Sequence, residues 1–169
     1  MTCSFTITLE TSAHLAQIEA IHETVFGPGR FARTAFRVRE GISADPNFCY
    51  VALEDDTVAG SVRLTKVAIG QKEAYLLGPL CVADPKQGGG IGKALVQKAC
   101  EAVHEKHALP VILVGDAPYY APLGFERAPR GIKMPGPVDY ARLLVAWPDA
   151  PSNLEGYQGV MCGISSSSS

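Results

Sequence analysis

The sequence predicts an α/β domain, of the α+β mixed-sheet kind, in which helices cover both faces of a central β-sheet. Two observations carry this prediction: a strand–turn–strand pattern in the first half of the chain and a strand–helix–strand pattern in the second half. The first pattern makes antiparallel neighbours and the second makes parallel ones, so the sheet contains both kinds of pairing. The 169 residues are 47% hydrophobic and 19% charged, which suits one domain with its own core.

The first half of the chain changes from strand-like to helix-like spacing and back. Apolar side chains alternate with threonine near the N-terminus, which is typical of a strand. Helical spacing follows, with Thr11 or Ser12 as a cap, and a glycine–proline turn ends this helix before an arginine-rich second one. The expected elements are a strand over 5–9, helices over 11–26 and 31–40, and strands over 48–53 and 58–69 around a tight turn at 54–57.

The second half is organised around a strand over 74–82 that is apolar at nearly every position. A strand without polar alternation is typical of the centre of a sheet, where both faces are buried. The segment that follows has the spacing of an amphipathic helix, and short apolar runs come after it. The expected elements are this helix over 90–107, a strand over 111–115, a short helix, and a last strand over 140–147.

Composition and charge exclude several classes of protein. The net charge is −2, so no basic surface for nucleic acid or anionic membrane is expected. No apolar run approaches the roughly 18 residues of a membrane span, and no secretory leader is visible, so a cytoplasmic location is expected. The five cysteines are scattered singly, which favours neither disulfides nor a metal site. We expect one domain over 1–150 and a tail over 151–169 with disordered final serines.

The most informative feature is a glycine-rich turn between the apolar strand and the amphipathic helix. Its four glycines leave main-chain N–H groups accessible to a ligand, without interference from Cβ atoms. The first turn of a helix adds unpaired N–H groups and a partial positive charge, and together they favour phosphate oxygens. The residues expected to bind phosphate are Gln87, Gly88, Gly89, Gly90, Ile91, Gly92 and Lys93.

Spacing separates three phosphate-binding motifs to which such a turn can belong. A Walker A loop needs glycine where the chain has Gln87, and a hydroxyl residue where it has Ala94. A dinucleotide fingerprint, G-x-G-x-x-G, finds no glycine at its last position in either register. The third pattern, Q/R-x-x-G-x-G/A after an apolar strand, is matched by Gln87, Gly90 and Gly92.

This third pattern is the signature of the GNAT superfamily of acetyl-CoA-dependent N-acyltransferases, which the sequence resembles. Residues 77–85 resemble the family's fourth strand and its exit turn, and 114–125 resemble its fifth strand and following helix. The G-P-L before the turn and the G-D-x-x-Y-Y-x-x-x-G-F after it resemble the YhbS-like branch. The resemblance is good over about 48–128 and poor after that. It implies the GNAT fold, acetyl-CoA as cosubstrate, and acetyl transfer to a primary amine of a small molecule or peptide.

The resemblance also implies roles for individual residues. The backbone of Leu80, Cys81 and Val82 binds the pantetheine arm, and the N–H of Val82 polarises the thioester carbonyl. Tyr120 stands four residues before a glycine, where the family often has the general acid that protonates the departing thiolate, and Tyr119 is the alternative. A phenol titrates near ~10 and a thiol near ~8.5, so this proton transfer is mildly uphill.

Other parts of the mechanism are left open. The strand over 74–82 has no carboxylate at its central positions, so Asp116 is the candidate base, with capping of the following helix as its alternative role. Two other functions are left open: a non-catalytic acyl-CoA-binding regulator and a nucleotide-binding domain. No metal, nucleic acid or membrane partner is expected, the acceptor amine is not identified, and a homodimer is one assembly that the sequence allows.

Overall fold

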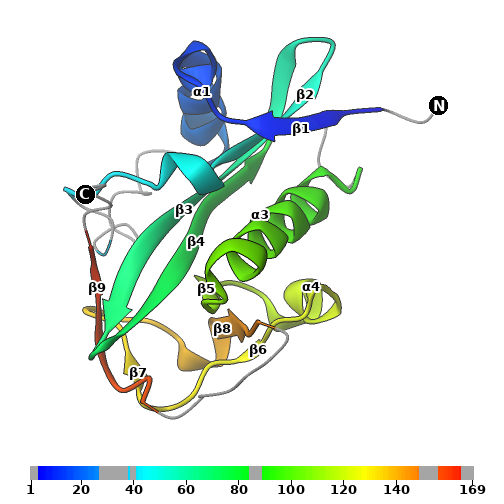
Figure 1. Cartoon of the computed structure of the whole chain (residues 1–169). Helices are drawn as coiled ribbons and strands as arrows, with labels where there is room; N and C mark the ends of the chain where they lie inside the picture. Colours follow the sequence, from blue (N-terminus) through cyan, green and yellow to red (C-terminus); the bar gives the residue numbers. More distant parts are fainter. Residues whose placement is uncertain (1–3, 27–37, 39–40, 84–88, 149–155, 165–169) are drawn as a thin grey trace.

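A nine-stranded mixed sheet forms the centre of the molecule in the part of the chain that the structure describes (Figure 1). The computed structural model describes residues 4–26, 38, 41–83, 89–148 and 156–164. The strands are β1 (Thr6–Leu9), β2 (Tyr50–Glu54), β3 (Thr57–Ile69), β4 (Lys72–Val82), β5 (Val111–Val114), β6 (Glu126–Arg127), β7 (Ile132–Lys133), β8 (Leu143–Ala146) and β9 (Gly159–Gly163). The described α-helices are α1 (Leu15–Phe26), α3 (Ile91–His107) and α4 (Ala117–Tyr120).

The sheet has the predicted mixture of parallel and antiparallel pairs. Its main path runs β1-β2-β3-β4-β5-β8-β6, and β9 pairs with both β3 and β7. β4 is parallel to β5 and β7 is parallel to β9, whereas the other described pairs are antiparallel. β4 lies between β3 and β5, and its residues 74–78 are buried. The predicted central position of this strand is therefore confirmed.

The hairpin between β2 and β3 forms where the sequence predicts it, for a local reason. Glu54 pairs with Thr57, so only Asp55 and Asp56 connect the two strands. Both aspartates have positive φ, 47° and 65°. Short polar side chains tolerate this left-handed region better than most, and a two-residue turn with positive φ at both positions matches the twist of paired strands.

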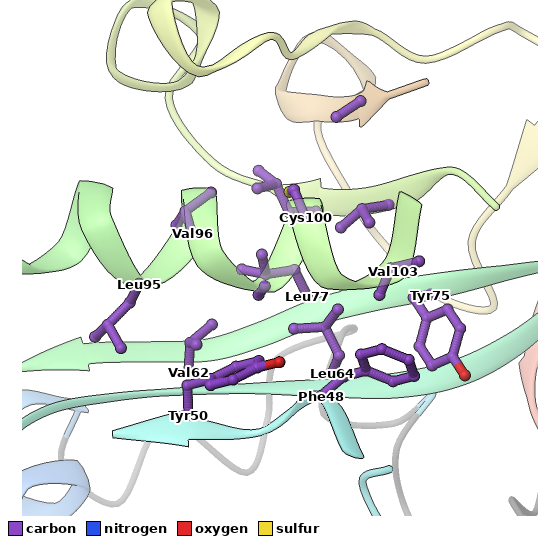
Figure 2. Close-up of a cluster of buried hydrophobic side chains, with 14 of the residues drawn as sticks. Phe48, Tyr50, Val62, Leu64, Tyr75, Leu77, Leu95, Val96, Cys100 and Val103 are labelled. Atoms are coloured by element: carbon purple, nitrogen blue, oxygen red, sulfur yellow. The ribbon is translucent and has the colours of Figure 1, made fainter. Parts of the chain in front are cut away.

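Helices pack on both faces of the sheet, as predicted, because side chains alternate along the strands. Tyr50 and Ala52 lie in a core cluster with α3, whereas Val51 between them packs with Ile18 of α1. Figure 2 shows the α3 side of this arrangement, where helix side chains lie over side chains of β2, β3 and β4. The labelled residues of that cluster are Phe48, Tyr50, Val62, Leu64, Tyr75, Leu77, Leu95, Val96, Cys100 and Val103.

The start of α3 is pressed onto the sheet at a glycine of β3. A Cβ on Gly60 would lie 2.9 Å from Ile91 Cγ2 and 3.1 Å from both Leu95 Cδ1 and the Cys81 carbonyl oxygen. Any side chain at this position would therefore push the helix away from the sheet. The close contact fixes the first turn of α3 relative to β3 and β4.

The other predicted helices and strands have mixed outcomes. Thr11 is the cap position of a one-turn 3-10 helix, Ser12–His14, that leads into α1. The strand predicted over 111–115 and the short helix after it are present as β5 and α4. The helix predicted over 31–40 lies outside the described residues except for Val38, and so do the final serines.

The C-terminal part of the chain is where the prediction is wrong. The predicted last strand over 140–147 is a 3-10 turn followed by β8, and β9 comes after it. β9 pairs with β3 and β7, so a domain boundary at residue 150 would divide the sheet. Glycine- and serine-rich surroundings suggested a tail because they offer little side chain to bury. Nevertheless, Tyr157 and Met161 are only 7% and 1% exposed.

Three glycines let chain segments cross closely where this C-terminal segment joins the sheet. A Cβ on Gly70 would collide with the Gln158 carbonyl, and one on Gly159 would lie 2.9 Å from the Gly70 nitrogen. A Cβ on Gly131 would lie 3.0 Å from the Tyr157 carbonyl oxygen. These glycines therefore allow main-chain segments to approach one another closely. From composition alone, the same glycines would suggest a flexible segment.

Candidate functional site

The two parallel strands at the centre of the sheet separate soon after they meet. β4 and β5 pair only at Tyr75 with Val111 and at Leu76 with Ile112. β4 then continues to Val82, whereas β5 ends at residue 114 (Figure 1). β4 and β5 form no further ladder pair beyond these two. We call the region beyond them the β4–β5 gap.

A bulge in β4 lies at the beginning of the β4–β5 gap. Val62 pairs with Leu80 and Leu64 pairs with Leu77, so β4 has one more residue than β3 between these pairs. The extra residue falls at Gly78–Pro79, which is joined by a cis peptide bond. Proline suits this position because it has no N–H to contribute to a ladder.

Beyond the bulge, Leu80 and Val82 turn their backbone N–H and C=O groups away from β3. Ala83 donates its N–H to the Ala59 carbonyl (2.8 Å). Peptide groups alternate sides along a strand, so the backbone groups of Cys81 face β3, as those of Ala83 do. The backbone groups of Leu80 and Val82 therefore face the opposite edge of β4. The backbone of two of the three residues predicted to bind pantetheine therefore faces the β4–β5 gap.

The side chain of the third residue, Cys81, belongs to the core. Cys81 pairs with Ser61 and is 2% exposed. Burial raises the pKa of its thiol to about 12. A thiol with so high a pKa is protonated at neutral pH and is a poor nucleophile, so Cys81 acts as a small apolar side chain.

The first turn of α3 presents main-chain N–H groups, as predicted for a phosphate site. Gly90 is the N-cap, with φ 86°, a left-handed conformation that glycine adopts readily. Ala94 donates to the Gly90 carbonyl (3.0 Å), so the N–H groups of Ile91, Gly92 and Lys93 have no partner within the helix. Gly89, Gly90 and Lys93 are exposed, whereas Gln87 and Gly88 lie outside the described residues.

This helix turn lies directly against the end of β4. A Cβ on Gly92 would lie 3.5 Å from Val82 Cγ2. The N–H groups at the start of α3 therefore lie next to the C-terminal end of β4, whose Leu80 and Val82 backbone groups face away from β3.

Tyr120, the predicted general acid, is packed at the end of β5. A Cβ on Gly115 would collide with its ring, and Phe125 contacts the ring edge-to-face at 5.7 Å between centroids. Burial, followed by the charges of Tyr119 and Asp116, raises the pKa of Tyr120 to about 12. The ring is half-buried and packs against the core cluster that also includes side chains of β4 and α3.

Tyr119, the alternative acid, has its hydroxyl at the start of α3. A Cβ on Gly92 would lie 2.7 Å from Tyr119 Oη, so the hydroxyl stands where a side chain of Gly92 would be. The Lys93 ammonium lies 5.5 Å from the centroid of the Tyr119 ring. The sequence did not predict this contact between Tyr119 and the glycine-rich turn. The adjacent pair Tyr119–Tyr120 was the only sequence feature that pointed to Tyr119 as a site residue.

Asp116, the candidate base, is at the surface. It occupies the N-cap position of α4 but makes no side-chain capping hydrogen bond, and only its main-chain carbonyl accepts from that helix. Its carboxylate forms an ion pair with Arg142 (3.3 Å), and its side chain is 76% exposed. The Asp116 carboxylate therefore lies at the surface beside Arg142. Neither of its predicted roles, general base or side-chain cap of the following helix, is evident.

A pair of parallel strands that separate beyond a bulge, with a glycine-rich helix start at the mouth of the opening, is the architecture of an acyl-CoA N-acyltransferase. Residues 45–127 match the family described as "Acetyltransferase (GNAT) domain". The chain is 25% identical over 140 residues to the "Uncharacterized N-acetyltransferase YjhQ" of Escherichia coli K12, a match covering 79% of this chain and 77% of that protein. The chain belongs to the GNAT family of acetyltransferases.

Solved structures support the same fold over nearly the whole chain. YhbS from Escherichia coli, in complex with CoA, is similar with a TM-score of 0.78 at 22% identity, covering 97% of this chain and 92% of that one. A GNAT family acetyltransferase from Brucella melitensis, in complex with acetyl-CoA, is similar with a TM-score of 0.68 at 26% identity, covering 95% and 96%. The predicted family, fold and enzyme class are confirmed.

None of the helices among the described residues is both long and apolar enough to cross a membrane. Within the same ranges, no three His, Cys, Asp or Glu side chains are arranged to hold a metal ion. The four described cysteines, Cys49, Cys81, Cys100 and Cys162, are free thiols.

Proposed function

We propose that the protein transfers an acetyl group from acetyl-CoA to a primary amine of a small molecule or peptide, by direct attack of the amine on the thioester. One observation carries the proposal: the gap-facing backbone of β4 continues the line of N–H groups at the start of α3. The complexes of similar proteins with CoA and acetyl-CoA support the same ligand here.

The diphosphate of the cofactor binds at the start of α3 and at the glycine-rich turn before it. The N–H groups of Ile91, Gly92 and Lys93 point out of the helix end, and no acidic side chain lies in the first turn to compete for them. Each charge–dipole contact of this kind contributes about 0.3–1 kcal/mol. Gln87 and Gly88 are proposed to complete the cradle by the family pattern that they match.

The length of the cofactor arm decides which strand residue meets the thioester. Because Val82 lies against Gly92, the arm passes Val82 close to its diphosphate end. An extended pantetheine arm is about as long as four residues of extended chain, roughly 13–15 Å, so the thioester lies further along β4. We therefore propose that the N–H of Leu80 polarises the thioester carbonyl and that Val82 bonds a pantetheine amide, instead of assigning both roles to Val82.

Tyr120 is proposed to act on the departing sulfur. Its pKa of about 12 lies above that of a thiol, ~8.5, so it serves mainly as a hydrogen-bond donor to the developing thiolate.

A hydrogen bond to a charged group contributes about 1.5–3 kcal/mol, so Tyr120→Phe is expected to lower kcat about 10- to 100-fold. Because the raised pKa keeps the phenol protonated, kcat/KM of the wild type is expected to show no alkaline fall below pH ~10. Steady-state kinetics over this range measures both effects; unchanged turnover of the variant would exclude the role.

The amine is proposed to lose its proton to water before it attacks. An alkylamine of pKa ~10.4 is neutral in about one molecule in 2,500 at pH 7, so the rate should rise with pH as this fraction grows. The Asp116 carboxylate is already in an ion pair with Arg142, and we propose a local structural role for it at the start of α4. The acceptor, a homodimer and a cytoplasmic location stay predictions.

Release of free CoA thiol tests the function directly. The purified chain, given acetyl-CoA and a panel of primary amines, is expected to release thiol at a rate that depends on at least one amine. Tight binding of acetyl-CoA with no acceptor-dependent release would contradict turnover and favour the regulator. Displacement of acetyl-CoA by ATP or NAD would favour a nucleotide-binding domain.

A further inference from the structure

The hydroxyl of Tyr119 occupies the place that a side chain would take at the second residue of α3. A Cβ on Gly92 would meet Tyr119 Oη at 2.7 Å, and the next contacts would be Val82 Cγ2 at 3.5 Å and Tyr119 Cζ at 4.0 Å. Only the hydroxyl would be closer than ordinary van der Waals contact. The missing side chain at Gly92 thus makes room for one polar atom.

This hydroxyl is aimed at the mouth of the helix. The Cα–Cβ direction of a helical residue tilts toward the helix N-terminus, so an atom at the Gly92 Cβ position lies beside the N–H groups of the first turn. Tyr119 is 38% exposed, so it is accessible to a ligand. The Lys93 ammonium lies over its ring and adds positive charge.

The neighbouring Tyr120 is held in a different place. Its ring rests on Gly115 and Phe125, and Tyr119 packs on it edge-to-face at 4.8 Å between centroids. Two adjacent residues of α4 therefore have their rings in different places. The Tyr120 ring lies at the end of β5, and the Tyr119 hydroxyl lies at the start of α3.

We propose that Tyr119 is a binding residue for the diphosphate of the acyl-CoA, to which its hydroxyl donates a hydrogen bond beside the N–H groups of Gly92 and Lys93. The inference rests on the proposed function. It adds that the protein selects an acyl thioester carrying a diphosphate over the same thioester on a phosphate-free pantetheine. Tyr119 takes no part in breaking the thioester bond.

Tyr119→Phe removes the hydroxyl and keeps the ring contacts with Tyr120 and Lys93. By calorimetry, the Kd for CoA is expected to rise about tenfold or more, as for loss of a hydrogen bond to a charged group. The same rise is expected for dephospho-CoA, which keeps the diphosphate and lacks the ribose phosphate. The kcat/KM for S-acetylpantetheine should change no more than in Tyr140→Phe. This control removes the hydroxyl of another tyrosine that is 38% exposed.

A double-mutant cycle tests the contact with Gly92 separately. Gly92→Ala places a methyl group 2.7 Å from the hydroxyl in the wild type, but in the Tyr119→Phe background its nearest contact is an ordinary 3.5 Å. Gly92→Ala is therefore expected to weaken CoA binding several-fold in the wild type and much less in the Tyr119→Phe background. If Gly92→Ala weakens CoA binding equally in the two backgrounds, the proposed position of the Tyr119 hydroxyl beside Gly92 is wrong.

The remaining outcomes separate this inference from the function on which it rests. Unchanged binding of CoA by Tyr119→Phe would overturn the inference, as would weakening seen with CoA but not with dephospho-CoA. Equal loss of kcat with acetyl-CoA and S-acetylpantetheine would place Tyr119 at the thioester and also overturn it. Absence of CoA binding by the wild type would overturn the proposed function itself.

Discussion

Leu80→Pro is expected to lower kcat with acetyl-CoA about 10²- to 10³-fold, the usual loss when one donor to a developing oxyanion is removed. The N–H of Leu80 points away from β3 and into the β4–β5 gap, so proline at this position removes a donor without breaking the β3–β4 ladder. CoA binding should remain measurable, because the start of α3 is untouched. Steady-state kinetics and calorimetry on the same preparation separate the two quantities.

Two matched variants control for packing and for the choice of donor. Leu80→Ala keeps the N–H and loses most of the side chain that packs on the α3 cluster, so it reports the cost of packing alone. Val82→Pro removes the other gap-facing N–H, and its kcat should fall much less than that of Leu80→Pro. If Val82→Pro shows the larger loss of kcat, the thioester meets Val82 and the arm-length argument is wrong.

Deleting residues 157–169 is expected to abolish cooperative folding. Tyr157 and Met161 are buried in the core cluster on the face opposite α3, and β9 pairs with β3. Burial of each such side chain contributes about 1.5–3 kcal/mol before the ladder is counted, and a whole domain has only about 5–15 kcal/mol of stability. Urea unfolding followed by circular dichroism measures the loss.

Single substitutions in β9 make the same test without removing chain. Met161→Ala is expected to cost about 2–5 kcal/mol, because Met161 is 1% exposed. Val160→Ala on the same strand is the control: Val160 is 55% exposed, and its replacement should cost less than about 0.5 kcal/mol. Similar unfolding midpoints for the two variants would contradict a structural role for β9.

Local patterns predicted most of the sheet and the start of α3. The apolar run of β4, the aspartate turn after Glu54 and the glycine-rich helix start are each contained in a few consecutive residues. Such features follow from side-chain alternation and φ preferences, which sequence shows directly. Pro79 also marked the place where β4 leaves a regular ladder.

Contacts between distant parts of the chain could not be predicted in the same way. The fit of Tyr119 Oη at Gly92 joins residues far apart in sequence, and no spacing rule connects them. β9 was missed because its glycines indicate flexibility in a sequence, whereas at Gly159 a glycine is needed for close contact with Gly70. The bulge in β4 decides that the backbone of Leu80, and not that of its neighbour Cys81, faces the gap. The position of this bulge follows only from the register of β3 and β4.

We propose that the start of α3 and the gap-facing edge of β4 together hold an acyl-CoA. Calorimetric titration of CoA into the purified full chain tests this binding most directly. We expect saturable heat with one CoA per chain, and affinity that falls sharply when pantetheine, which lacks the phosphates, is titrated instead. No detectable association with CoA or acetyl-CoA, or equal affinity for CoA and pantetheine, would contradict it.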